Sequence, residues 1–178
     1  SFARKLITWL TSHTAAGMLF DVDTRLRPNG AAGLMVTHFE SFRRYQMREG
    51  DNAAWVWEHQ ALTRARFCAG DAEIGERFEA LRTAVLRQAR QPGPLRDEIV
   101  AMRERVAEGH ANPTGLFDLK HDRGGMVDIE FTVQFLVLLH SAAHAELTRN
   151  KGNIALLHMA GELGLINATA AARVADAY

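Results

Sequence analysis

Apolar side chains recur at helical spacing along most of this chain. At its start, Phe2, Leu6, Trp9 and Leu10 fall on one face of a helix that we expect to end near residues 11–14. From residue 39 onward, amphipathic stretches follow one another, separated by Gly, Pro and capping residues. These patterns predict helices over residues 40–48, residues 52–67 with Asn52 as cap, a stretch capped by Asp71, a stretch after the break at 91–94, residues 126–145, the stretch between Gly152 and Gly164, and a last one capped by Asn167.

Residues 20–28 have instead the period of a β-strand. Their sequence, Phe-Asp-Val-Asp-Thr-Arg-Leu-Arg-Pro, alternates apolar or neutral residues with charged ones. Because a strand places successive side chains on opposite faces, the charged ones would form a single row: Asp21, Asp23, Arg25 and Arg27. A turn at 28–30 ends the predicted strand, and residues 33–36 are expected to pair back on it.

The fold class that follows is mainly α, with an α+β remnant near the start of the chain. A length of 178 residues fits one medium domain or two small lobes. We place the boundary between a first region at residues 1–38 and a helical domain at 39–178. The chain opens without Met inside a helical pattern and closes inside another, so we expect a segment of a longer polypeptide, truncated at its C-terminus.

Composition excludes several classes of function. Lys and Arg together number 21, as do Asp and Glu, so no global basic field would attract nucleic acid. The single cysteine, Cys68, excludes an intrachain disulfide and a cysteine-based zinc site, which favours a reducing, cytoplasmic location. No signal peptide is recognisable and no apolar run is long enough for a membrane span, so we expect no membrane partner.

The charged row at residues 21–27 carries the strongest candidate chemistry. Two carboxylates on one face suit a hard cation such as Mg²⁺, and two guanidiniums beyond them suit phosphate oxygens. Asp21 and Asp23 alone make a weak site, because Mg²⁺ needs further ligands. The alternative interpretation is a half-buried strand with a solvated charged face.

Two other clusters have structural interpretations. Gly124 and Gly125 precede a predicted helix whose first turns carry Asp128 and Glu130, a pattern that could bind an anion. A tight turn with acidic residues complementing the helix dipole is the favoured interpretation. In Trp-Glu-His-Gln at 57–60, we expect the Trp to pack in the core and the Glu and His to form surface pairs with Arg66.

Several motifs together resemble the bacterial glutamine synthetase adenylyltransferase family, in order along essentially the whole chain. After residues 20–28 come Asn-Gly-Ala-Ala-Gly-Leu at 29–34, Trp-Glu-His-Gln at 57–60, Phe-Asp-Leu-Lys at 117–120 and Gly-Gly-Met-Val-Asp-Ile-Glu-Phe at 124–131. The sequences of these motifs are similar to those of the family's C-terminal, adenylylating domain. The resemblance implies the end of a DNA polymerase β-like nucleotidyltransferase sheet followed by a helical bundle.

The resemblance also implies an activity: transfer of AMP from ATP to a tyrosine of glutamine synthetase, reversed by a paired domain. Asp23 matches the third of three carboxylates that hold Mg²⁺ in this family, whereas Asp21 matches no family ligand and becomes the weaker candidate. Arg25 and Arg27 match a basic pair for which we infer triphosphate or substrate contact. The family's activity responds to glutamine and to the PII signalling protein, which are the implied effector and partner.

This sequence departs from the family pattern in one respect: it contains no Gly-Ser…Asp-x-Asp motif, which would supply the other two carboxylates. We therefore expect residues 1–178 to be inactive by themselves. Two alternatives stay open: a helical regulatory or docking module that binds glutamine synthetase or PII, and the deadenylylating copy of the domain.

Overall fold

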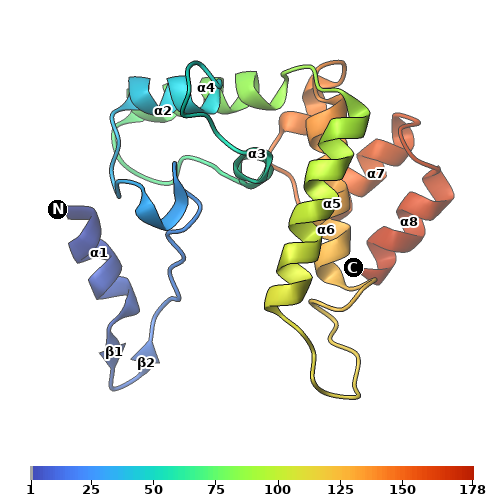
Figure 1. Ribbon diagram of the computed structural model, residues 1–178, viewed down its shortest axis with the longest axis horizontal. Coiled ribbons are helices and arrows are strands. Elements are labelled where there is room, and N and C mark those ends of the chain that lie inside the picture. Colours follow the sequence, from blue (N-terminus) through green and yellow to red (C-terminus); the bar gives the residue numbers. More distant parts are fainter. Residues whose placement is uncertain (1) are drawn as a thin grey trace. The chain divides into compact units, whose positions relative to one another are not determined.

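The computed structural model describes residues 2–178 and is mainly helical, as the sequence predicts (Figure 1). The chain divides into two compact units, of which the first ends at Ala54 and the second begins at Trp55. The boundary predicted after residue 38 separates a catalytic lobe from a helical domain, whereas the division after Ala54 separates compact units. The boundary after residue 38 therefore stays a prediction. Within the described residues, no helix has the length and apolar character needed to cross a bilayer.

The first unit contains two helices, a short hairpin and a long irregular stretch. Helix α1 (Phe2–Thr11) is followed by the antiparallel strands β1 (His13–Thr14) and β2 (Gly17–Met18). A 3-10 turn, η1 (Gly30–Ala32), then precedes helix α2 (Phe39–Gln46). The helices predicted at residues 2–10 and 40–48 are thereby confirmed. The only strands among residues 2–178 are those of the hairpin.

The strand predicted at residues 20–28 is wrong, as is the one predicted at 33–36. Residues 20–29 adopt no helix or strand. A strand needs a neighbouring strand to receive its backbone hydrogen bonds, and among the described residues no strand pairs with this segment. Its polar groups bond locally instead: the Asp23 carboxylate accepts the Arg25 backbone N–H at 2.8 Å, which bends the chain.

The second unit is entirely helical in its regular structure. Its elements are α3 (Val56–Leu62), α4 (Ala72–Leu86), α5 (Pro92–Gly109), α6 (Met126–His140), the 3-10 turn η2 (Ala145–Thr148), α7 (Asn153–Glu162) and α8 (Ala168–Ala177). The predicted caps Asp71 and Asn167 are confirmed, since their side chains accept the backbone N–H of Ile74 and Ala170. The helix predicted over 52–67 is shorter than expected, and Asn52 does not cap it.

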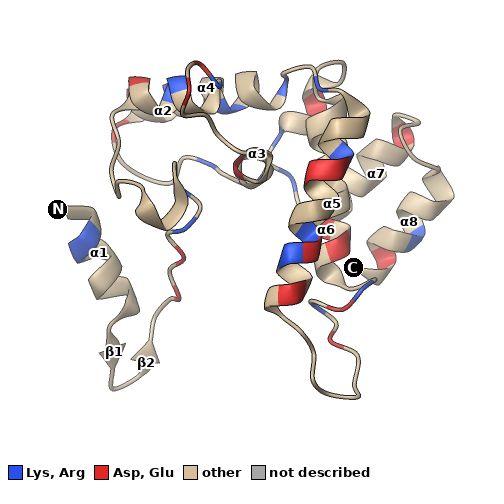
Figure 2. Cartoon of the chain, in the orientation of Figure 1, with Lys and Arg blue, Asp and Glu red and all other residues tan. Residues whose placement is uncertain are grey.

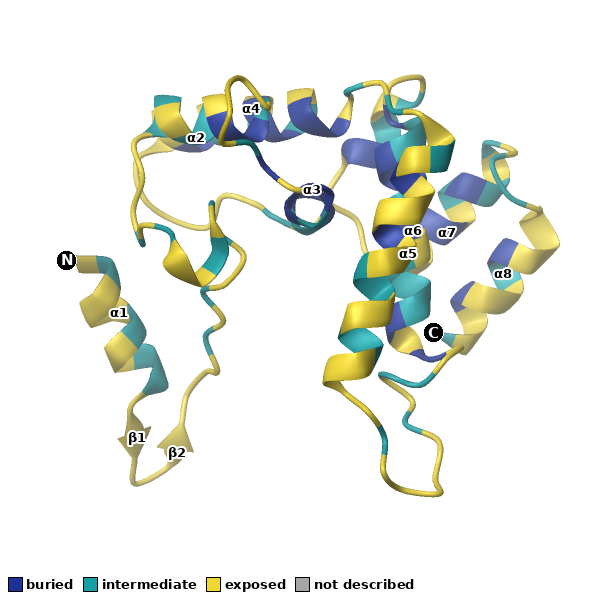
Figure 3. Ribbon diagram, in the orientation of Figure 1, coloured by how far each residue is buried: buried dark blue, intermediate teal, exposed yellow. Residues whose placement is uncertain are grey.

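The core of the second unit lies where α6 meets η2, α7 and α8. Its fully buried members are Val133, Val137, Leu147, Leu156, Leu157 and Ala175. Figure 3 shows the buried positions concentrated on α3, α6 and α7, whereas α5 is exposed along much of its length. Glu58 and His59 are also buried, so the surface pairs expected with Arg66 are wrong. They lie on α3, a helix of seven residues of which five are buried.

A buried guanidinium ties three distant segments of this unit together. The Arg82 side chain is 3 % exposed, and its Nε donates to the Leu62 carbonyl oxygen at 2.7 Å. Its two Nη atoms donate to the carbonyls of Thr63 at 2.9 Å and Thr148 at 2.8 Å. Because Arg82 takes up the last carbonyls of α3, it explains why that helix ends at Leu62.

Candidate functional site

The residues predicted to form the charged row lie in the irregular stretch of the first unit. Asp23 and Arg25 face each other in a bidentate pair: Arg25 Nη2 lies 2.8 Å from Oδ2 of Asp23, and Nε lies 3.0 Å from Oδ1. Both side chains are solvent-exposed, at 49 % for Asp23 and 79 % for Arg25. The structure thus joins two predicted site residues, with the guanidinium bonded to both carboxylate oxygens.

This pairing lowers the pKa of Asp23 from its ordinary 3.8 to about 2, through hydrogen bonds from the Arg25 guanidinium and then from the Arg25 backbone N–H. The folded pKa is depressed, so the contribution of the pair to stability is complete above about pH 3.8 and is lost as the pH falls through 2. In chain 1–178 with the Arg25→Ala change, we expect the carboxyl carbon of Asp23 to titrate near 3.8 in a ¹³C NMR experiment. Arg4→Ala, on α1, is the control that should leave the Asp23 midpoint in place. An unchanged midpoint in Arg25→Ala would contradict the pairing.

Arg27 is engaged differently, because its guanidinium points into the loop that follows. Its Nε donates to the Gly33 carbonyl at 3.2 Å and Nη2 donates to the Ala31 carbonyl at 3.0 Å. Nη1 donates to the carbonyl of Thr24. All three nitrogens of this side chain are therefore used by backbone acceptors within a single loop.

Asp21 is exposed and lies outside the Asp23–Arg25 pair. Among residues 2–178, no group of three or more His, Cys, Asp or Glu side chains could hold a metal ion. The residues at hand therefore do not fit a complete Mg²⁺ site. At most they would contribute one or two carboxylates to it.

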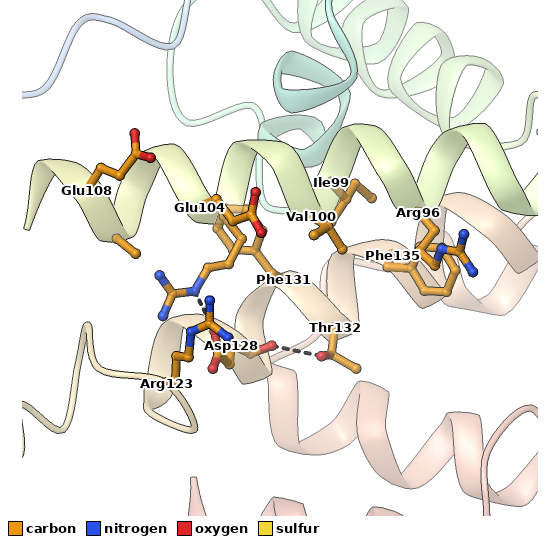
Figure 4. A pocket seen from close by; sticks show the side chains of 12 residues that line it. Arg96, Ile99, Val100, Glu104, Glu108, Arg123, Asp128, Phe131, Thr132 and Phe135 are labelled. Atoms are coloured by element: carbon orange, nitrogen blue, oxygen red, sulfur yellow. Dashed lines mark hydrogen bonds and ion pairs between the residues drawn. The ribbon is translucent and has the colours of Figure 1, made fainter.

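A groove of about 590 Å³ lies along α5 and α6 of the second unit (Figure 4). Apolar side chains from both helices line it, including Val100 and Ile99 from α5 and Phe131 and Phe135 from α6. Charged side chains of both signs also border it: Arg96, Arg103, Glu104, Glu108, Arg123 and Asp128. Figure 2 shows this mixture of charges along α5. The lining contains neither His nor Cys.

At one end of the groove, Asp128 connects α6 to the preceding loop and to α5. Its carboxylate pairs with Nε of Arg103 and accepts the backbone N–H of Gly124. Burial alone would raise the pKa of Asp128, but the bonds from Gly124 and Arg103 outweigh burial and hold the pKa below its ordinary value. Gly125 contacts the loop so closely that a Cβ there would lie 2.6 Å from the Leu119 carbonyl oxygen. These contacts agree with the structural interpretation of the Gly124–Gly125 turn.

Sequence reasoning did not identify Arg103 as part of this cluster. Nothing in the spacing of α5 distinguishes Arg103 from the other charged residues of that helix, and its partner lies 25 residues further along the chain. Glu130 also had a partner that the sequence did not indicate, since its carboxylate accepts a hydrogen bond from the Tyr178 hydroxyl at 2.9 Å. Both contacts arise from tertiary packing alone.

Comparison with known proteins identifies the class to which this chain corresponds. A family model described as glutamate-ammonia ligase adenylyltransferase matches residues 1–81, which include the Asp23–Arg25 pair and α1 to α3. The match covers less than half of the chain and agrees with the resemblance inferred from the motifs.

Full-length relatives extend the match across the whole chain. The bifunctional glutamine synthetase adenylyltransferase/adenylyl-removing enzyme of Ralstonia nicotianae is 90 % identical over 178 residues, which are 100 % of this chain and 19 % of that protein. The enzyme of the same name from Burkholderia mallei is 63 % identical over 180 residues, covering 100 % of this chain and 20 % of that protein. Residues 1–178 therefore correspond to a segment of this family of bifunctional enzymes and span about a fifth of the length of these relatives.

Proposed function

We propose that this chain is part of an enzyme that transfers AMP from ATP to a tyrosine of glutamine synthetase and, through a paired domain, removes it again. The observation that carries the proposal is the 90 % identity, over the entire chain, to a protein named for both activities. Such an enzyme would act in the cytoplasm in regulating nitrogen assimilation, with glutamine and the PII protein as its effectors.

Within that activity, the first unit would supply the last part of a DNA polymerase β-like catalytic lobe. Exposed apolar side chains in this unit support the assignment, because Phe2, Trp9 and Phe20 are each more than 60 % exposed and would be buried by neighbouring strands. Those strands would also give residues 20–28 the partner that the described residues lack. The remaining part of the lobe would lie elsewhere in the longer protein.

Asp23 is the carboxylate we propose as the Mg²⁺ ligand, with Asp21 as a weaker candidate. Bound Mg²⁺ would neutralise charge on the triphosphate, and its remaining ligands would come from other parts of the full-length protein. The exposed guanidinium of Arg25 would help to neutralise phosphate charge, for which it must first leave Asp23. The sequences of the motifs are the basis for distinguishing the adenylylating from the deadenylylating domain. On that basis we propose that the chain belongs to the adenylylating copy.

A docking function for the second unit is the rival proposal. The specific observation in its favour is the loop before α6, in which Leu116, Phe117 and Leu119 are between 59 % and 79 % exposed. An ordered loop with three large apolar side chains in solvent is typical of a protein interface. In this rival the partner would be glutamine synthetase or the PII protein, and no chemistry would occur.

The proposed function is tested by an assay of labelled AMP transfer from ATP to glutamine synthetase. We expect turnover from the full-length protein and none from chain 1–178, because one or two carboxylates cannot by themselves complete an Mg²⁺ site. The control is a longer segment of the protein that contains an Asp-x-Asp motif together with residues 1–178, which should show Mg²⁺-dependent ATP binding. Turnover by chain 1–178 alone would overturn the expectation.

A further inference from the structure

Arg27 lies at the centre of the loop formed by residues 24–33. Its three nitrogens donate to the carbonyls of Thr24, Ala31 and Gly33, so the two ends of the loop are joined through one guanidinium. A guanidinium has five N–H donors in a rigid fork, and three of them are used here. An ammonium group in the same place would lack this geometry.

Backbone contacts show how closely the loop folds around this side chain. The Gly30 N–H donates to the Arg27 carbonyl at 2.8 Å, and Gly30 has a φ of +56°, in the left-handed region. At Gly33, a Cβ would lie 1.8 Å from the Pro28 carbonyl oxygen, so any larger residue would force the backbone apart. The chain therefore crosses itself at Gly33, directly beside the acceptor of Arg27 Nε.

Apolar packing does little to hold this loop. The side chains of Leu26, within the loop, and Leu34, just after it, are 64 % and 77 % exposed. One further anchor comes from α2: the hydroxyl of Tyr45, a residue only 5 % exposed, accepts the Asn29 N–H at 3.1 Å. The loop conformation thus depends on polar contacts, most of which Arg27 makes.

We propose that Arg27 is a positioning residue, which holds the 24–33 loop closed and thereby orients Asp23 and Arg25, rather than a ligand of the triphosphate. The inference rests on the proposed function for the role of Asp23, but the loop contacts stand on geometry alone. Thr24, whose carbonyl Arg27 binds, lies between Asp23 and Arg25 in the chain. Release of that carbonyl would free the backbone on which both side chains are mounted.

Two variants separate positioning from charge. Arg27→Lys keeps the positive charge but loses the fork, whereas Gly33→Ala keeps Arg27 and opens the same loop by steric clash. In the full-length protein we expect both to lower kcat for AMP transfer by about 10- to 100-fold, with little change in the KM for ATP. If Arg27 instead bound the triphosphate directly, kcat and KM would respond differently. Arg27→Lys would then retain kcat, and Arg27→Met would raise the KM for ATP.

A second measurement does not depend on activity. Amide hydrogen exchange at Asn29, Gly30 and Gly33 should be about tenfold faster in both variants of chain 1–178. Arg25→Lys is the matched control, because Arg25 contacts Asp23 rather than the loop carbonyls, and it should leave this exchange unchanged.

The outcomes are distinguishable. Unchanged amide hydrogen exchange in Arg27→Lys overturns the proposal. The proposal also fails if the loss of AMP-transfer rate disappears once the rate is corrected for the fraction of protein that is folded. If Asp23→Asn retains full transfer, the proposed function fails in its assignment of Asp23. In that case Arg27 still holds the loop if exchange accelerates, but orienting Asp23 would have no catalytic consequence and the positioning role would be rejected.

Discussion

Replacing Asp23 with alanine in the full-length protein is expected to lower AMP transfer to glutamine synthetase by about 100- to 1,000-fold. The proposed reason is loss of a metal-binding carboxylate, which is ionised at physiological pH both when it is paired with Arg25, at a pKa of about 2, and at its ordinary pKa of 3.8. The change also frees the Arg25 guanidinium, which donates to both carboxylate oxygens of Asp23. The measurement is the initial rate of labelled AMP incorporation at saturating ATP.

Asp21→Ala is the matched control, because it removes an exposed carboxylate of the same kind two residues away. Because Asp21 is the weaker candidate ligand, we expect its rate to fall much less than that of Asp23→Ala, and both variants to bind glutamine synthetase normally. Loss of binding with chemistry retained in Asp23→Ala would favour the docking function instead. Equal loss of rate in both variants would place the metal between the two carboxylates and restore Asp21 as a ligand.

The largest expected effect on stability comes from Arg82→Met. The change leaves the carbonyls of Leu62, Thr63 and Thr148 buried without their donor, at a cost of about 3–5 kcal/mol in the free energy of unfolding. Methionine fills a similar volume, so the loss would report the hydrogen bonds rather than a cavity. Urea unfolding of chain 1–178, followed by tryptophan fluorescence, measures it.

A Trp9→Phe background restricts that fluorescence signal to Trp55 and Trp57, both in the second unit. Arg87→Met is the control: Arg87 lies on the surface just after α4, and we expect its change to stay within about 0.5 kcal/mol. A stability of Arg82→Met equal to that of the control would show that water or rearranged backbone satisfies the three carbonyls.

Helices were predictable from the sequence because their signals are local. Asp71 and Asn167 cap the helices expected of them, since a cap needs only a side chain and an N–H three residues further on. The end of α3 was not predictable, because Arg82, 20 residues away, determines where its carbonyls find donors. Local periodicity cannot report a contact of that kind.

The candidate site shows the same division. The charged row was visible in the sequence, and the structure does bring Asp23 and Arg25 together. The alternation that predicted a strand was misleading, because a strand is defined by its neighbour and the period alone cannot supply one. The inward turn of Arg27 depends on a chain crossing at Gly33, which only the three-dimensional fold reveals.

The order in which the ribosome makes the second unit determines when Arg82 can bind all three of its carbonyl acceptors. Of the three carbonyls that Arg82 binds, two are made before it, but Thr148 is made 66 residues later. Until Thr148 has been made, one N–H donor of the Arg82 guanidinium on α4 lacks its carbonyl acceptor. Burying that unpaired donor would be unfavourable. We therefore expect the unit to close late, after α6 has been made, and a nascent chain halted before Thr148 to remain open to proteases and chaperones.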